Sequence, residues 1–239
     1  MSGRTDNSRR LPTDDVRAAK PGRVTPPSPT PVAGAAPDPL LRPMAGAALG
    51  GIALFVLTAV ALQFVRAELD WIRTPMSFYL LGDEGRWLQA GYVALACAIV
   101  ALAVGWYRAL PNPARSGAPT LLFLLAATGL GVAAFAPTAQ ACLPPTLWNW
   151  LHGVAAQTAF LCVTTAMLLQ AWRLRVDRRW RRRFAVAFAV ALVAFAGVWL
   201  LALWRELPRG LAQKVLIAII VLWLATMSVW LWRDARTPG

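Results

Sequence analysis

The sequence is short of the residues from which metal centres and disulfide frameworks are built. It has one histidine, His152, with 3 cysteines and 11 acidic residues in a chain of 239. No histidine pair, cysteine–histidine cluster or acidic group stands at a metal-ligand spacing, so we expect no metal site and no cofactor. Cys97 and Cys162 lie within apolar runs, which leaves Cys142 alone and argues against an intramolecular disulfide.

Charged residues are also scarce, and this excludes an ordinary soluble domain. They make up 15% of the chain against 58% hydrophobic residues, and the mean hydropathy is +0.52. Such a composition needs lipid around it. Crossing a bilayer takes about 20 mostly apolar residues in a helix, and six runs are long enough. They are residues 44–65, 87–107, 118–136, 147–172, 184–204 and 211–232.

These runs are apolar on every side, whereas the strands of a β-barrel would alternate. We therefore predict an all-α fold, a polytopic bundle of six transmembrane helices over residues 44–236, in which the lone Lys214 snorkels to the surface. Residues 1–43 hold nine of the 18 prolines and predict a disordered, basic cytoplasmic tail. The spacings Gly46–Gly50 and Ala47–Gly51 indicate close helix packing, either within the bundle or between two copies.

Lysine and arginine are unevenly divided between the two sides of such a bundle. Eighteen of the 24 fall in the tail, the second and fourth loops and the C-terminus, and six fall on the other side. The positive-inside rule then puts both termini in the cytoplasm, for a protein of a bacterial cytoplasmic (inner) membrane. The net charge of +13 is mostly this asymmetry, so we expect no nucleic-acid binding. The basic stretch 173–183 serves insertion in this interpretation, with recognition of anionic lipid headgroups as the alternative.

Polar side chains collect in the fourth run, at its outer end. It carries Asn149, His152 and Gln157, among others, while the fifth run has no polar side chain. A rise of about 1.5 Å per residue places His152 roughly 7 Å below the outer boundary. Thr146 is a predicted helix N-cap just before this run. Polar groups at this depth face protein or trapped water rather than lipid.

Several segments resemble a family of six-helix bacterial and archaeal membrane proteins known as domain of unknown function 998. The matching segments are TPMSFYLLGDEGRWLQAGYVAL, AAFAPT, LHGVAA and RELPRGLAQKVLIAIIVLWL. The family pattern falls on Ser77, Gly82, Gly85, Pro137, His152, Gly153, Glu206, Arg209 and Gly210. The resemblance covers about residues 45–232 and implies a fold without a reaction, with these outer segments grouped into one site. An acidic residue that the family tends to place after the third span is missing from PTAQACLPP, which leaves Glu206 or the first outer loop as an acidic partner for His152.

The leading functional hypothesis is an integral membrane protein without catalytic activity that binds a lipid or a small apolar ligand in an outer-leaflet pocket. Membrane lipids would be its partners. The ligand-binding residues would be Ser77, Tyr79, His152, Glu206 and Arg209. The alternative is an outer-face lipid hydrolase or transferase with His152 as general base, Glu206 orienting it, and Ser77 as a third catalytic candidate. Transport of a small molecule ranks third, because only the fourth run offers polar groups at mid-bilayer.

Overall fold

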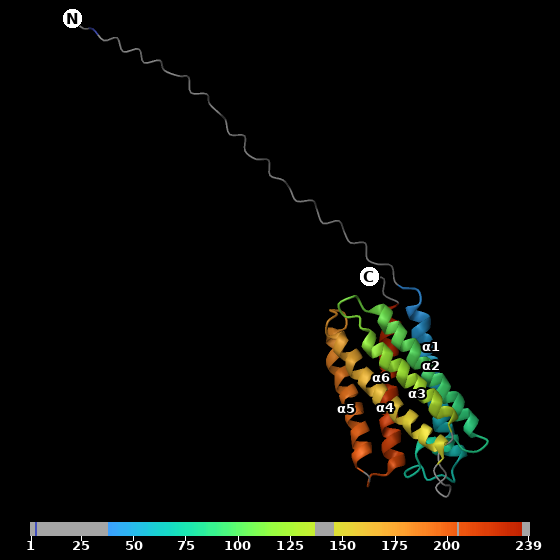
Figure 1. Ribbon diagram of the computed structural model, residues 1–239. Helices are drawn as coiled ribbons and strands as arrows, with labels where there is room; N and C mark the ends of the chain where they lie inside the picture. Colours follow the sequence, from blue (N-terminus) through green and yellow to red (C-terminus); the bar gives the residue numbers. More distant parts are fainter. Residues whose placement is uncertain (1–2, 4–37, 137–145, 205, 236–239) are drawn as a thin grey trace. The chain divides into compact units, whose positions relative to one another are not determined.

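The computed structural model describes Gly3 and residues 38–136, 146–204 and 206–235. Within them lie six long helices, each long and apolar enough to cross a membrane, and no strand (Figure 1). The long helices are α1 (Leu41–Val65), α2 (Gly85–Ala109), α3 (Gly117–Phe135), α4 (Leu147–Leu174), α5 (Phe184–Leu203) and α6 (Arg209–Asp234). Two short 3-10 helices, η1 (Met76–Leu80) and η2 (Arg181–Arg183), lie in the first and fourth loops.

The predicted all-α bundle of six apolar helices is confirmed, and its helix bounds differ from the predicted runs by at most three residues. Most of the predicted tail, residues 1–43, lies outside the described residues, as do Pro137 and Cys142. Thr146 caps α4 as predicted, because its hydroxyl accepts a hydrogen bond from the backbone N–H of Asn149 at 3.3 Å.

Helices that follow one another in the sequence pack side by side, and α6 closes the bundle against α1 and α2 (Figure 1). Since the connections are short, neighbouring helices are antiparallel. We call the end at which α2, α4 and α6 begin the η1 end, and the opposite end the Arg179 end. The backbones of α4 and α6 approach each other closely at hardly any position, so side chains must fill the space between them.

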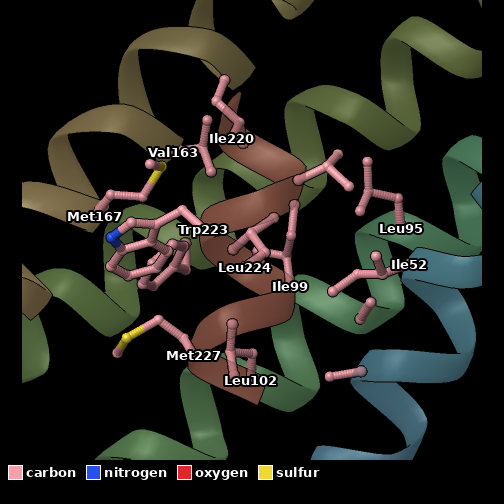
Figure 2. Close-up of a cluster of buried hydrophobic side chains, with 14 of the residues drawn as sticks. Ile52, Leu95, Ile99, Leu102, Val163, Met167, Ile220, Trp223, Leu224 and Met227 are labelled. Atoms are coloured by element: carbon pink, nitrogen blue, oxygen red, sulfur yellow. The ribbon is translucent and has the colours of Figure 1, made fainter. Parts of the chain in front are cut away.

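Trp223 of α6 fills part of that space (Figure 2). Its side chain projects toward Met167 of α4 and is 2% exposed. The indole N–H donates to the carbonyl oxygen of Ala187 in α5 at 2.9 Å, which satisfies a donor that lipid could not. On the other side of α6, Leu224 faces Ile99 of α2 (Figure 2). Trp223 and Leu224 thus link α6 to α4, α5 and α2 at this level of the bundle.

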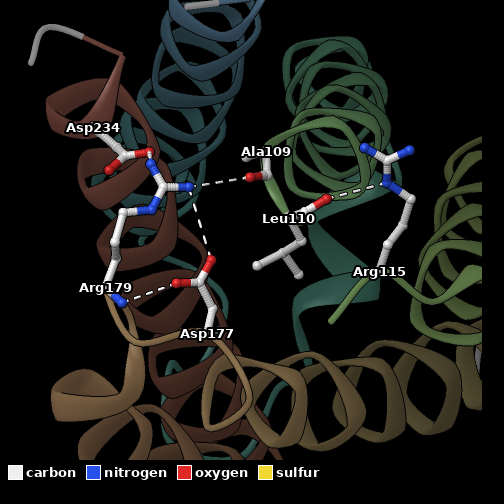
Figure 3. A network of polar contacts seen from close by, with 6 residues as sticks. All are labelled: Ala109, Leu110, Arg115, Asp177, Arg179 and Asp234. Carbon is white, nitrogen blue, oxygen red and sulfur yellow. Dashed lines mark hydrogen bonds and ion pairs between the residues drawn. The ribbon is translucent and has the colours of Figure 1, made fainter. Parts of the chain in front are cut away.

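At the Arg179 end, one guanidinium ties the fourth loop to two helices (Figure 3). Arg179 donates to the carboxylate of Asp234 in α6 at 3.2 Å and to the carbonyl of Ala109 in α2 at 3.4 Å, and it lies 3.8 Å from the carboxylate of Asp177. The next residue, Trp180, is 1% exposed and meets Trp106 edge to face at 4.7 Å between ring centroids. The basic loop is therefore folded against the bundle.

Glycines of α1 allow close packing within the bundle. A Cβ atom on Gly51 would overlap the carbonyl oxygen of Ala94 in α2, and one on Gly46 would lie 2.7 Å from the Trp232 ring of α6. Gly50 has open space around it. The GxxxG pair Gly46–Gly50 therefore does not form one contact face, because its two glycines meet different surroundings.

Gly51→Val should destabilise the bundle, whereas Gly50→Val should not. The added methyl groups at residue 51 must push α1 away from α2, and overpacking of this kind costs about 1–3 kcal/mol. Thermal unfolding of each purified variant in the same detergent, followed by tryptophan fluorescence, measures the difference. Equal midpoints for the two variants would contradict the packing of α1 on α2 described above.

Candidate functional site

A cavity of about 610 Å³ lies between α4 and α6, in the part of the bundle nearer the η1 end. Pockets that hold small molecules span about 300–1,000 Å³. The walls deep in the bundle are apolar and include Ile99, Val163 and Leu224. Two lining residues, Leu161 and Trp199, are 38% and 48% exposed on the outside of the bundle. The cavity therefore reaches the lipid-facing surface beside α5.

The polar lining residues lie toward the η1 end. In the described part of the chain they are Ser77, His152, Gln157, Arg209 and Gln213, together with Tyr92 of α2, which carries a phenol hydroxyl. Three of the five predicted ligand-binding residues, Ser77, His152 and Arg209, are thus brought to one cavity. Tyr79 is fully buried and Glu206 is exposed, and neither lines it.

His152 lies in the second turn of α4 and is 7% exposed. Its Nδ1 is 2.9 Å from the carbonyl oxygen of Ala136, at the end of α3. A carbonyl can only accept, so Nδ1 carries the proton of this hydrogen bond. The other ring nitrogen, Nε2, has no hydrogen-bond partner among the described residues and belongs to a side chain that lines the cavity. Nε2 is therefore the free polar atom of the imidazole.

Three acidic residues of the first loop, Glu68, Asp70 and Glu84, have other partners than His152. Arg66 pairs with Glu68 and lies 3.9 Å from Glu84, and the hydrogen bond from Arg66 lowers the pKa of the Glu68 carboxyl. Asp70 accepts from the backbone N–H of Ile72 at 2.9 Å. The predicted pairing of His152 with Glu206 or a first-loop carboxylate is not found among the described residues, because the Ala136 carbonyl takes the position at Nδ1.

Ser77 reaches the cavity because the first loop is bonded to the start of α6. The N–H of Leu211 donates to the carbonyl of Ile72 at 2.7 Å, and the N–H of Met76 donates to Oε1 of Gln213 at 2.8 Å. Gly210 lies against the same stretch of loop, where a Cβ would be 2.6 Å from the carbonyl oxygen of Thr74. The loop and the first turn of α6 thus form one packed unit.

Lys214 completes this unit rather than snorkelling alone to the surface. Its ammonium donates to the carbonyl of Trp71 and to Oε1 of Gln63, both at 2.8 Å, and lies 4.8 Å from the centre of the Tyr79 ring. A cation over an aromatic face is attracted by the ring quadrupole. Burial raises the pKa of the Tyr79 phenol above its ordinary value, so the ring stays neutral beneath the ammonium.

Gln213 and Lys214 were not predicted as functional residues from the sequence. Both lie in RGLAQK, inside the segment RELPRGLAQKVLIAIIVLWL that carries the family resemblance. The sequence did offer one signal for their role, since these two polar residues stand next to each other at the start of a long apolar run. Their partners could not be read from the sequence, because these lie more than a hundred residues away in the chain.

Gly210→Val should loosen the first loop. The larger side chain displaces the Thr74 carbonyl, and a loss of about 1–2 kcal/mol raises the open population about 5- to 30-fold. Arg73, which is 86% exposed, gives trypsin a cleavage site in this loop, so the cleavage rate there should rise by a similar factor. Gly131→Val is the matched control, because a Cβ at residue 131 meets nothing within 4 Å. An unchanged rate in Gly210→Val would show that the loop does not depend on this contact.

Comparison with known proteins gives one match. Residues 49–230 match the family described as Protein of unknown function (DUF998). This range contains every described lining residue of the cavity and every residue of the contact between the first loop and α6. No curated protein and no solved structure matches the chain. The match covers most of the sequence, as the resemblance of its outer segments predicts, and the chain therefore belongs to the DUF998 family of proteins of unknown function.

Proposed function

We propose that this membrane protein binds a lipid or another small apolar molecule in the cavity between α4 and α6. The observation that carries the proposal is the division of the cavity walls: apolar in the depth of the bundle, polar at one end only. An amphiphile has the same division. Lateral access beside Leu161 and Trp199 lets such a molecule enter from the bilayer without crossing water.

The geometry supports binding better than catalysis. A general base of the predicted kind needs a nucleophile within hydrogen-bond reach of Nε2, where no described residue is bonded, and the predicted arrangement also used the Glu206 carboxylate to orient the imidazole. In the described chain the orienting group at Nδ1 is the neutral carbonyl of Ala136, and the cavity is lined by no carboxylate. A binding site needs only the free Nε2 and its polar neighbours.

We place the η1 end, and with it the polar part of the cavity, at the outer leaflet of a bacterial cytoplasmic membrane. The fourth loop at the Arg179 end carries exposed arginines at positions 175, 178, 181 and 182. Basic loops stay on the cytoplasmic side during insertion. The described ends of the bundle, Leu41 and Asp234, lie at that same end and would face the cytoplasm.

Gly153→Leu should reduce ligand binding. Gly153 lines the cavity, and a Cβ there meets nothing within 4 Å, so a leucine enters the cavity without displacing α4. Native mass spectrometry of the protein released from mild detergent should show a retained small molecule in the wild type. The retained fraction should correspond to about tenfold weaker binding, or about 1.4 kcal/mol, in the variant.

The matched control is Gly50→Leu, which also adds a leucine to open space but lies on α1, outside the cavity. It should retain the molecule as the wild type does. A wild type with no retained molecule, or equal retention in all three proteins, would count against a binding cavity.

The orientation can be tested by cysteine labelling in intact cells. In a chain whose own cysteines are replaced by alanine, a cysteine at the exposed residue 206 should react with a membrane-impermeant maleimide, and one at the exposed residue 178 should react only after the membrane is permeabilised. The reverse pattern would invert the proposed orientation.

A further inference from the structure

We infer that the ligand is a single-chain amphiphile whose head is an oxyanion, either a carboxylate or a phosphate monoester. This rests on the proposed function and names the chemistry of the ligand. Arg209, His152 and Gln213 would bind the head, and the apolar depth of the cavity would take the chain.

The charge at the cavity points to an anion. Arg209 is its only charged lining residue in the described part of the chain. The side chain is exposed and makes no ion pair with any described residue. Four other described arginines make ion pairs, Arg66, Arg73, Arg108 and Arg179, and the rest of the described arginines make none, so what distinguishes Arg209 is its position at the cavity. An unpaired guanidinium beside an apolar cavity is suited to a carboxylate or phosphate, which it can bind through two parallel N–H groups.

The start of α6 adds to this positive potential. Arg209 is the first residue of the helix, so its side chain stands where the helix dipole is positive. The first turn carries no acidic residue that would neutralise the dipole. The charge of Arg209 and the dipole therefore favour the same sign of ligand.

Two buried or half-buried polar groups can hold the same head. Oε1 of Gln213 already accepts from the Met76 N–H, which leaves the amide Nε2 of Gln213 to donate. The Nε2 of His152, a side chain that is 7% exposed, is free as well. A neutral imidazole accepts from the hydroxyl of a protonated head, and an imidazolium donates to an ionised one. His152 can thus bond an ionised head only as an imidazolium, and as a neutral ring it bonds the hydroxyl of a protonated head.

The shape of the cavity fits one chain. Beyond Gln157 the lining residues are apolar, and they come from α2, α3, α4 and α6, so the chain is enclosed by helices. The cavity volume of about 610 Å³ falls within the range of small-molecule pockets, about 300–1,000 Å³. Any further chain of a larger lipid would stay in the bilayer beside Trp199, which is half exposed.

Three probes have the same C18 chain and different head groups: oleyl alcohol, oleate and oleyl phosphate. Comparing them separates the contribution of the head group to binding from that of the hydrocarbon chain. Their dissociation constants are measured on the full chain in nanodiscs of phosphatidylcholine. Charge-assisted hydrogen bonds to the head should make one or both anions bind about 10- to 100-fold more tightly than the alcohol. The tighter of the two anions identifies a carboxylate or a phosphate as the natural head.

Arg209→Gln should reduce the preference for the anion to less than about threefold, and Arg209→Lys, which keeps the charge but loses the two parallel N–H donors, should retain only part of it. Arg86→Gln is the control, because Arg86 is also exposed at the η1 end but does not line the cavity, so it should keep the wild-type preference. If Arg209→Gln fails to fold, the ratio measured on the wild type still decides.

The inference is overturned if the wild type binds the alcohol as tightly as the anions, which leaves the proposed function standing. It is also overturned if Arg209→Gln keeps the full preference or if Arg86→Gln loses it. Binding of none of the three probes removes both the inference and the proposed function.

Discussion

The contact between the first loop and the first turn of α6 is the constraint on which the η1 end of the bundle depends. Four contacts made by residues 210–214 of α6 converge there: the Leu211 N–H on Ile72, the Gln213 side chain on Met76, the Lys214 ammonium on Trp71, and Gly210 against Thr74. The three hydrogen bonds satisfy polar groups that would otherwise be unpaired at the level of the lipid, and Gly210 lets the loop backbone approach the helix. Together they fix where Ser77 and Arg209 stand.

A second link holds the opposite wall of the cavity. The hydrogen bond from Nδ1 of His152 to the Ala136 carbonyl joins the start of α4 to the end of α3, two helices that also pack closely along their length. Gly129 of α3 lies against the backbone of α4, where a Cβ would be 2.8 Å from the carbonyl of Ala155. The α3–α4 pair is thus tightly bound, while α4 and α6 stay apart, and the cavity lies in the space that remains.

The transmembrane spans and some of the site residues could be predicted from the sequence, for different physical reasons. Apolar runs report burial in lipid residue by residue, so the helix bounds could be predicted closely. Ser77, His152 and Arg209 were placed together by depth and by the family pattern. Tyr79 and Glu206 were included on the same grounds, but one packs under Lys214 and the other stays exposed. The positions of Tyr79 and Glu206 depend on side-chain direction and on contacts between distant segments. The spacing of apolar residues in the sequence reveals neither.

Side-chain direction also decides which helix forms the cavity wall beside which the proposed ligand would enter. For this reason the sequence did not identify α5 as that wall. Its sequence is the most uniformly apolar of the six, and only three of its alanines are buried, Ala187, Ala191 and Ala194. Ala187 and Ala191 lie in the half toward the Arg179 end, where Trp223 also bonds the Ala187 carbonyl, and Ala194 lies at the middle of the helix. Toward the η1 end α5 presents Val198, Trp199 and Ala202 to the cavity without such an anchor. In the proposed function, the η1 half of α5 is therefore the side on which an apolar chain would exchange with the bilayer.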